Sequence, residues 1–177
     1  DGGLQLFKQE QNALQALTSL AGSHQQAAMN AEQQTLFLIS GKQVKKVNRQ
    51  LELVAHYQAE SSETPSAVHW YKDHLYVAYL NRIQVLDTEL NLQRQFIFEG
   101  GLPDAIRVTG DKVFLSIKPL GLQVLDISQP EQAYLLRDYV STGYGLKQLS
   151  LPDELNGAYL YTANKGLQWL PLFNRNH

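Results

Sequence analysis

A repeated phrase constrains the fold of this chain more than any other feature of its sequence. The chain opens with GLQLF, and close variants return as IQVLD, GLQVLD and GLQWL. A glutamine fixes the register of the copies, and apolar residues follow it in nearly every one. A period of about 40 residues indicates stacked copies of one supersecondary unit. The marker glutamines, spaced 38, 41, 39 and 45 residues apart, are Gln5, Gln43, Gln84, Gln123 and Gln168.

Each period contains short segments with the composition of β-strands. Runs rich in aromatic and β-branched residues precede the marker, as in LFLIS, LYVAYL, VFLSIK and YLYTAN. A strand with a tight turn comes before these runs, as in AVHWYKDH and AIRVTGDK, and a more polar strand such as LELVAHYQ follows the marker. We therefore predict an all-β fold, a β-propeller or propeller segment of about four blades, each of four antiparallel strands.

The repeat frame predicts a single propeller domain or segment. Because the chain starts and stops at the same strand of a blade, we expect three full blades, with two strands before them and three after. A closed ring of four blades needs only one marker strand in its closing blade. Either one copy lies outside the sheets, or the chain belongs to a larger ring completed by a second chain or by further sequence. The domain spans 1–177, with repeats at approximately 3–40, 41–80, 81–120 and 121–165 and a partial fifth at 166–177.

Residues 5–30 fit the repeat less well than the rest of the chain. They are rich in strong helix formers, and Leu14, Leu17 and Ala21 lie at helical spacing. Apolar alternation in the same segment also fits a strand, and the repeat register places residues 13–20 where LELVAHYQ lies in the next copy. We favour the strand over the helix, because tertiary context overrides propensity in short segments.

The segment GLQVLDISQPEQAYLLRDYVSTGYG resembles the LVIVD-type repeat of bacterial β-propellers. In that repeat, a GL-x-V-x-D-x-S-x-P segment forms the third strand of a blade, and Asp126, Ser128 and Pro130 fit this pattern. The resemblance is good over residues 121–145 and weaker elsewhere. It implies a propeller fold and a location outside the cytoplasm: extracellular, periplasmic or at the cell surface. Since the family has no single shared activity, the resemblance implies no catalytic residue.

Composition excludes several classes of protein. The net charge of −2 argues against a nucleic-acid partner, which requires a dense basic surface. No apolar run approaches the roughly 18 residues of a membrane span. The chain has no cysteine, which excludes disulfides and thiolate metal sites and fits an exported bacterial protein. Its opening, DGGLQLF, lacks an initiator methionine, so we expect a processed or excised piece of a longer protein.

The motif HWYKDH is the strongest candidate for a metal or acid–base cluster, but the repeat gives it a structural role. His69 aligns with Arg107 at an outward strand position, and Asp73 and His74 align with a hairpin turn. Nothing in the pattern brings a further ligand close to these side chains, so we predict no metal site and no cofactor. No nucleophile elbow or phosphate-binding loop is present either, which argues against an enzyme.

The loops between the second and third strands of the blades each carry a basic residue. In known propellers these loops share one face with the connections between blades, so repetition places four cations around one mouth, near acids and a tyrosine. The hypothesis is that this face binds a protein partner or a small anionic ligand; ordinary solvated turn residues are the alternative. The candidate binding residues are Lys42, Arg82, Lys118, Lys165, Glu99 and Tyr144.

These observations predict a non-catalytic binding or assembly module that acts through one loop face. Its unfinished sheet edges favour a protein partner or self-association, since unpaired backbone groups recruit another strand. The first alternative is a propeller enzyme, a lyase or hydrolase that acts on saccharides at the central mouth. The second is a purely structural segment that completes a ring.

Overall fold

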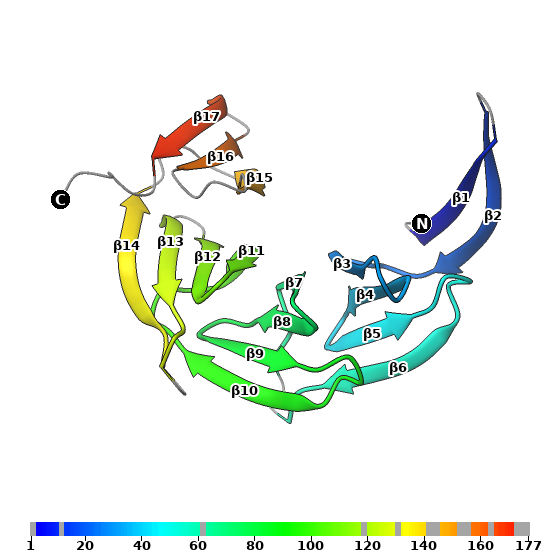
Figure 1. Ribbon diagram of the computed structural model, residues 1–177, viewed down its shortest axis with the longest axis horizontal. Helices are drawn as coiled ribbons and strands as arrows, with labels where there is room; N and C mark the ends of the chain where they lie inside the picture. The colour runs from blue at the N-terminus through cyan, green and yellow to red at the C-terminus, as the bar shows by residue number, and fades with distance from the viewer. Residues whose placement is uncertain are drawn as a thin grey trace.

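The computed structural model describes residues 3–10, 13–60, 63–117, 120–129, 132–140, 146–151, 157–162 and 165–171. Regular structure in these ranges is entirely β, in five antiparallel sheets that follow one another around an arc (Figure 1). In each four-stranded sheet the first strand lies toward the centre of the arc and the last lies on its rim. This is a β-propeller arrangement, and the predicted fold class is confirmed. The part of the chain that is described contains no helix long and apolar enough to cross a membrane.

The sheets have the strand numbers that the repeat predicts: two, four, four, four and three. The hairpin is β1 (Gly3–Glu10) with β2 (Ala13–Ala21), and the end sheet is β15 (Leu146–Ser150), β16 (Gly157–Thr162) and β17 (Gly166–Pro171). The first full sheet contains β3 (Ala27–Asn30), β4 (Thr35–Ser40), β5 (Gln43–Val47) and β6 (Leu53–Gln58). The second contains β7 (Ala67–Tyr71), β8 (His74–Ala78), β9 (Arg82–Leu86) and β10 (Leu92–Ile97). The third contains β11 (Pro103–Thr109), β12 (Lys112–Ile117), β13 (Gly121–Asp126) and β14 (Tyr134–Val140).

The N-terminal segment is a strand, as favoured over a helix. β2 pairs with β1 along its whole length, with Leu4 opposite Leu20. Both leucines pack against buried Leu38, Val47 and Leu51 of the first full sheet. This packing explains why the strand forms despite a helix-forming composition, because burial of an apolar face outweighs intrinsic propensity.

Apolar layers between neighbouring sheets hold the arc together. Phe37 of the first full sheet stacks on Trp70 of the second, with ring centroids 5.0 Å apart. The layer between the second and third full sheets includes Ile83, Ile106 and Val113, all fully buried. Each full sheet therefore contributes side chains from both of its faces to the core, as a propeller requires.

The predicted alignment of Gln43 with the other marker glutamines is wrong by two residues. Ser40 pairs directly with Gln43 across a two-residue turn, and the backbone of Tyr79 bonds that of Arg82 in the same way. Gln43 is thus equivalent to Arg82, and Lys45 is equivalent to the marker Gln84. A shift of two residues leaves each side chain on the same face of the strand, so the predicted arrangement of strands in the blade is still correct.

The buried marker Gln84 has a structural role. Its Oε1 accepts a hydrogen bond from the Tyr57 hydroxyl of the preceding sheet at 3.1 Å, and its Nε2 donates to Gln95 at 3.0 Å. The amide therefore satisfies polar groups between two sheets, which a purely apolar side chain at this position would leave without partners.

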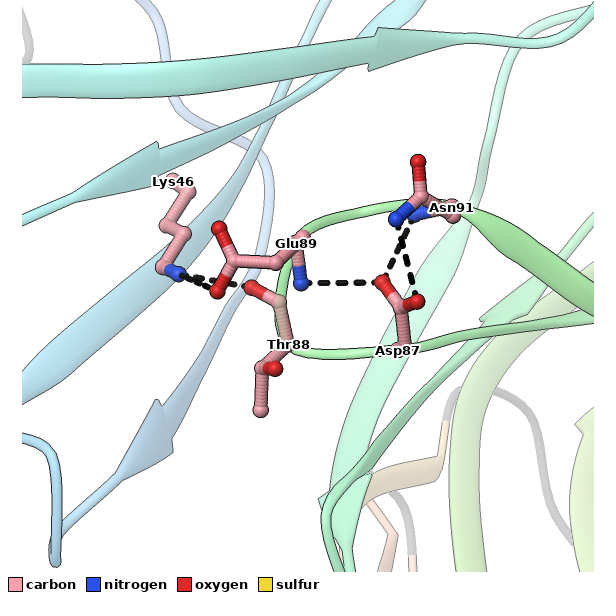
Figure 2. Close-up of polar contacts among 5 residues, drawn as sticks. All are labelled: Lys46, Asp87, Thr88, Glu89 and Asn91. Carbon is pink, nitrogen blue, oxygen red and sulfur yellow. Dashed lines mark hydrogen bonds and ion pairs between the residues drawn. The ribbon is translucent and has the colours of Figure 1, made fainter.

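The turn after the third strand of a blade is another repeated device. In the second full sheet, the Asp87 carboxylate accepts hydrogen bonds from the backbone of Glu89 at 2.9 Å and of Asn91 at 2.8 Å (Figure 2). Asn48 fills the same role in the first sheet. Both turns place a buried leucine, Leu51 or Leu90, in the left-handed region, with φ of 63° and 65°. Burial of these side chains offsets a conformation that non-glycine residues otherwise avoid.

A buried lysine connects this turn to the preceding sheet. Lys46 on β5 donates to the carbonyl of Thr88 at 2.6 Å and contacts the Glu89 carboxylate at 3.3 Å (Figure 2). The ammonium group is therefore satisfied where it would otherwise be a costly buried charge.

Candidate functional site

A groove opens on the face that carries the connections between sheets. It has a volume of about 580 Å³, within the range of about 300–1,000 Å³ typical of ligand sites. The connections that lead into β3, β7 and β11, together with the first two residues of β11, form its walls, and the turn between β8 and β9 adds Leu80. The lining residues are Gln25, Gln26, Glu63, Thr64, Pro65, Ser66, Leu80, Leu102, Pro103 and Asp104.

Hydrogen bonds and one ion pair fix the walls of this loop-face groove. Gln26 Nε2 donates to the backbone carbonyl of Asp104 at 2.6 Å, which joins the first connection to the start of β11. The Arg82 guanidinium lies 2.7 Å from the Glu63 carboxylate and 4.9 Å from the Tyr79 ring centroid. Burial raises the pKa of Tyr79 further above its ordinary value. The groove is therefore largely preformed.

Of the predicted binding residues, the structure shows the contacts of Arg82 in most detail. The side chain of Arg82 is only 15% exposed and is engaged by Glu63. Lys42, Lys165 and Glu99 are exposed, and within the described ranges none of the three forms an ion pair. The last two predicted residues, Lys118 and Tyr144, lie outside the described residues. Binding by this set stays a prediction, and among its described members Arg82 alone is joined to the groove, through Glu63.

Sequence reasoning missed the apolar rim of the groove. Leu80 and Leu102 are 51% and 52% exposed, although both lie in loops of otherwise polar or small residues. The signal was available in the segments LNR and GGLPD, where a leucine stands in a turn with no strand pattern to bury it. The predicted binding set was chosen mainly by charge and therefore does not include these leucines.

The prediction for His69 was wrong. His69 does not point outward: it is partly buried between the innermost strands β7 and β11, and its Nδ1 accepts the backbone N–H of Val108 at 3.1 Å. Burial, with a smaller effect of Arg107, lowers the pKa of His69 to about 4. The cause is the geometry of the centre, where innermost strands approach closely enough for a side chain to reach the next sheet. Among the described residues, no group of three or more His, Asp or Glu could hold a metal ion.

The neighbouring hairpin also differs from the prediction by one residue. Its two turn residues are Lys72 and Asp73, with φ of 44° and 61°, and His74 already belongs to β8. Two successive positive φ values define a type I′ turn, which matches the twist of the strands that it connects.

A second candidate surface lies on the end sheet. Side chains alternate along β16 and β17, so that one set packs on the third full sheet and the other remains exposed. The exposed set forms an aromatic and aliphatic face, which we call the end-sheet face. Its members are Tyr159 (44% exposed), Tyr161 (47%), Leu167 (69%) and Trp169 (45%).

Comparison with known proteins supports the fold. No protein-family model matches the sequence, and no curated protein matches it significantly. Solved structures with the same architecture include a protein of unknown function from Bacteroides caccae, at 9% identity and a TM-score of 0.67. They also include the β-propeller domain of Cps50 (Swd1) from Myceliophteria thermophila (12% identity, TM-score 0.65) and a chain of a mitotic checkpoint complex (10%, 0.72).

These alignments cover 89%, 86% and 90% of this chain, but only 65%, 52% and 53% of the other chains, in the same order. The chain thus spans between half and two thirds of the length of these solved structures. Identities this low show the fold alone. The class of protein that the sheets and the comparisons define is a β-propeller segment.

Proposed function

We propose that this chain is a non-catalytic binding and assembly module, a propeller scaffold that joins a further propeller sheet through its end-sheet face. We also propose that its repeat is of the LVIVD type and that it acts outside the cytoplasm of a bacterium. The GLQVLDISQP segment over β13 supports the repeat type, and the lack of cysteine is compatible with an exported protein.

One observation carries the assembly proposal: the end-sheet face repeats the contact positions of the full sheets. In the third full sheet the cross-strand pair Phe114–Val124 faces the end sheet and is buried beneath it. In the end sheet the equivalent pair is Tyr159–Trp169, at the same place relative to the β-turn. The pairs Tyr76–Val85 and Phe37–Lys46 hold this place in the second and first full sheets, and each faces the next sheet.

Packing within the end sheet holds the aromatic side chains of the end-sheet face in place before any association. The rings of Tyr159 and Trp169 pack on each other with centroids 4.7 Å apart. The Trp169 ring extends over Gly157, where any larger residue would place its Cβ inside the ring. Large aromatic side chains that are fixed before association lose little conformational entropy and can bury about 150–250 Å² each.

The opposite end of the arc offers a matching surface. The β1–β2 hairpin packs one face on the first full sheet and leaves Phe7 and Leu14 45% and 70% exposed. The hairpin and the end sheet stand at the two ends of the open arc (Figure 1). A second copy can therefore present its β1–β2 hairpin to the end-sheet face, in the head-to-tail manner in which the sheets already pack.

Solution mass over a range of concentrations tests this proposal. The chain has a mass of 20.0 kDa, and we expect light scattering after size exclusion to give a larger mass as concentration rises. Leu167→Arg should restore the monomer, because a charged side chain cannot enter a sheet-to-sheet layer without a partner. In a Trp70→Phe background Trp169 is the sole tryptophan, and its emission should shift to the blue on association.

Leu53→Arg is the matched control. Leu53 is 56% exposed on the rim strand β6, away from the end sheet, so this variant should associate like the unmodified chain. A constant mass of 20.0 kDa at every concentration would contradict self-docking. Equal dissociation by both variants would show that association uses no defined face.

We do not extend the proposal to a lyase or hydrolase of saccharides. The Glu63 carboxylate in the loop-face groove lies 2.7 Å from the Arg82 guanidinium, and this ion pair gives it a structural role in the groove wall.

A further inference from the structure

We propose that the free edge of β1 binds a β-strand of a partner protein in which an aromatic residue stands between two aliphatic residues. The added strand takes the place that the second strand has in each full sheet, and its aromatic ring enters a pocket at Met29. This site is separate from the end-sheet face, and the inference does not rest on the assembly proposed above.

A β-bulge identifies β1 as the third strand of a blade. In the third full sheet the pairing of β13 with β14 shifts between Val124 and Leu125, the two residues that follow the marker Gln123. The other full sheets have the shift at the same place. The hairpin has it between Leu6 and Phe7, which follow the marker of β1 in the same way. The place of a second strand therefore lies beside β1.

The edge of β1 at this place can accept another strand. Among the described strands β1 pairs with β2 alone, and it forms the side of the hairpin that is turned toward the centre of the arc (Figure 1). It has eight residues and no proline, so every backbone N–H is present. Unpaired N–H and C=O groups of an edge strand recruit a further strand, and a two-stranded hairpin gains stability from a third.

An apolar pocket adjoins the layer between the hairpin and the first full sheet. Its volume is about 330 Å³, and its walls include Met29, Leu36 and Leu51. Leu36 and Leu51 also belong to the packed layer that Leu4 of β1 covers. Met29 is 62% exposed, which is unusual for a large apolar side chain on an innermost strand. The pocket is thus a continuation of the packed layer beneath the hairpin.

The repeat shows what fills the equivalent place one sheet further along. Met29 pairs with Leu36 as Trp70 pairs with Leu75, and both leucines stand at the same distance from the turn into the third strand. Trp70 stacks on Phe37, which lies on the second strand of the preceding sheet, with ring centroids 5.0 Å apart. Met29 therefore occupies the position of a residue that normally packs on an aromatic ring of the preceding second strand.

The other walls of the pocket lead to the same conclusion. Leu75 and Leu90 hold the places of Leu36 and Leu51 in the second full sheet. Both belong to the buried cluster that includes Phe37. The residues that line the pocket are therefore the equivalents of residues that pack in one layer with Phe37, and the pocket is the place of a Phe37 equivalent.

The residue types of the added strand follow from the four second strands of this chain. Their central residues read Leu-Phe-Leu, Leu-Tyr-Val, Val-Phe-Leu and Ala-Tyr-Leu. In each, the aromatic residue pairs with the residue that follows the marker position of the third strand. The same register places the aromatic residue of the added strand opposite Leu6, with its ring against Met29, a contact that the thioether sulfur favours.

The test uses a fluorescein-labelled peptide with a second-strand sequence, DKVFLSIK, which is that of residues 111–118. A matched peptide has serine in place of phenylalanine. Fluorescence anisotropy is measured with the Leu167→Arg chain, so that self-association does not interfere. We expect saturable binding of the phenylalanine peptide, at least about tenfold tighter than that of the serine peptide, because the ring is the group that becomes buried. Equal affinities would overturn the inference.

Met29→Asp tests the pocket itself. It should weaken binding of the phenylalanine peptide by more than about tenfold, because an aromatic ring would desolvate the new carboxylate without pairing it. Leu92→Asp is the matched control, since Leu92 is 48% exposed on the rim strand β10 of another sheet. Binding that both variants leave equally strong would contradict docking at Met29.

Backbone pairing is tested with two further peptides, each methylated on alternate backbone nitrogens. Such methyl groups lie along one edge of a strand, and only one edge of the added strand faces β1. One methylated peptide should therefore lose binding and the other should keep it. Equal affinity of the two would show that the peptide does not add to the edge of β1 as a strand.

Self-association separates this inference from the assembly proposal. Met29→Asp in the otherwise unmodified chain should still associate in light scattering, whereas Leu167→Arg should lose association and keep peptide binding. Failure of the peptide to bind would therefore leave the assembly proposal intact. Loss of association in Met29→Asp would assign the edge of β1 to a second copy and overturn the inference of a separate partner.

Discussion

The third full sheet and the end sheet use the same strand register but present opposite environments on one face. Phe114, Leu122 and Val124 of the third sheet are buried, whereas their equivalents Tyr159, Leu167 and Trp169 are 44–69% exposed. The difference follows from position in the arc, because only the third sheet has a described neighbour on that side. It also explains the residue types, since tyrosine and tryptophan place an apolar ring and a polar group on one side chain.

The largest expected difference is between the losses of stability caused by alanine substitution of Phe114 and of Tyr159. We expect Phe114→Ala to lower the free energy of unfolding by about 3–5 kcal/mol, since it empties a packed layer. Tyr159→Ala removes an exposed ring and should cost under about 1 kcal/mol in the monomer. Urea unfolding at low protein concentration measures both. Equal losses would mean that the end-sheet face is covered in solution.

The second expected effect is a dependence of folding stability on pH, which arises from His69 at the centre of the arc. Folding lowers the pKa of His69 from 6.5 to about 4, so its neutral form is favoured in the folded state. As pH falls from 6.5 to 4, the unfolded chain binds a proton first, and stability should drop by about 3 kcal/mol. Above pH 6.5 this contribution is complete.

His69→Gln keeps a side-chain oxygen for the Val108 N–H but cannot titrate, so its stability should fall less steeply than that of the unmodified chain over this pH range. Urea midpoints at several pH values, with the exposed His56→Gln as the control, test this expectation. An unchanged slope in the His69 variant would contradict a buried neutral histidine.

A smaller effect should come from the turns that follow the third strands. Asp87→Ala removes the acceptor of two backbone and two side-chain hydrogen bonds, and we expect a loss of about 1–2 kcal/mol. Desolvation opposes ionisation of Asp87, but the hydrogen bonds from Asn91, Glu89 and Gln93 together outweigh it and lower the pKa of its carboxyl. The contribution should therefore be present at neutral pH and disappear only as pH falls below 3.8. Asp87→Asn, which keeps an acceptor oxygen, should recover part of the loss in thermal unfolding.

The smallest effect concerns the packing of Trp169. Gly157→Ala introduces a Cβ where the indole ring lies, so the ring should rotate away from Tyr159. Because both rings are partly exposed, we expect a stability change under about 1 kcal/mol. The fluorescence anisotropy of Trp169 in the Trp70→Phe background should fall as the ring gains freedom. An unchanged anisotropy would show that the ring is not held against Gly157.

The sequence by itself determined the strands, the blade and the number of strands in each sheet. Runs of alternating apolar residues, separated by turn residues, are compatible with few structures other than short strands. The repeated phrase around Gln84 and Gln123 then allowed the strands of one blade to be aligned with those of the next. The two-residue error in the alignment of Gln43 did not change the predicted faces of the strand, since side chains alternate between faces with period two.

Only the tertiary structure decided which side chains meet. The burial of His69 depends on the approach of β11 to β7, and the pairing of Arg82 with Glu63 depends on where a long connection runs. The groove arises from three connections, before β3, β7 and β11, that no local pattern brings together. Strand pattern is a property of neighbours in the chain, whereas a site is set by contacts between sheets, which the repeat fixes only in outline.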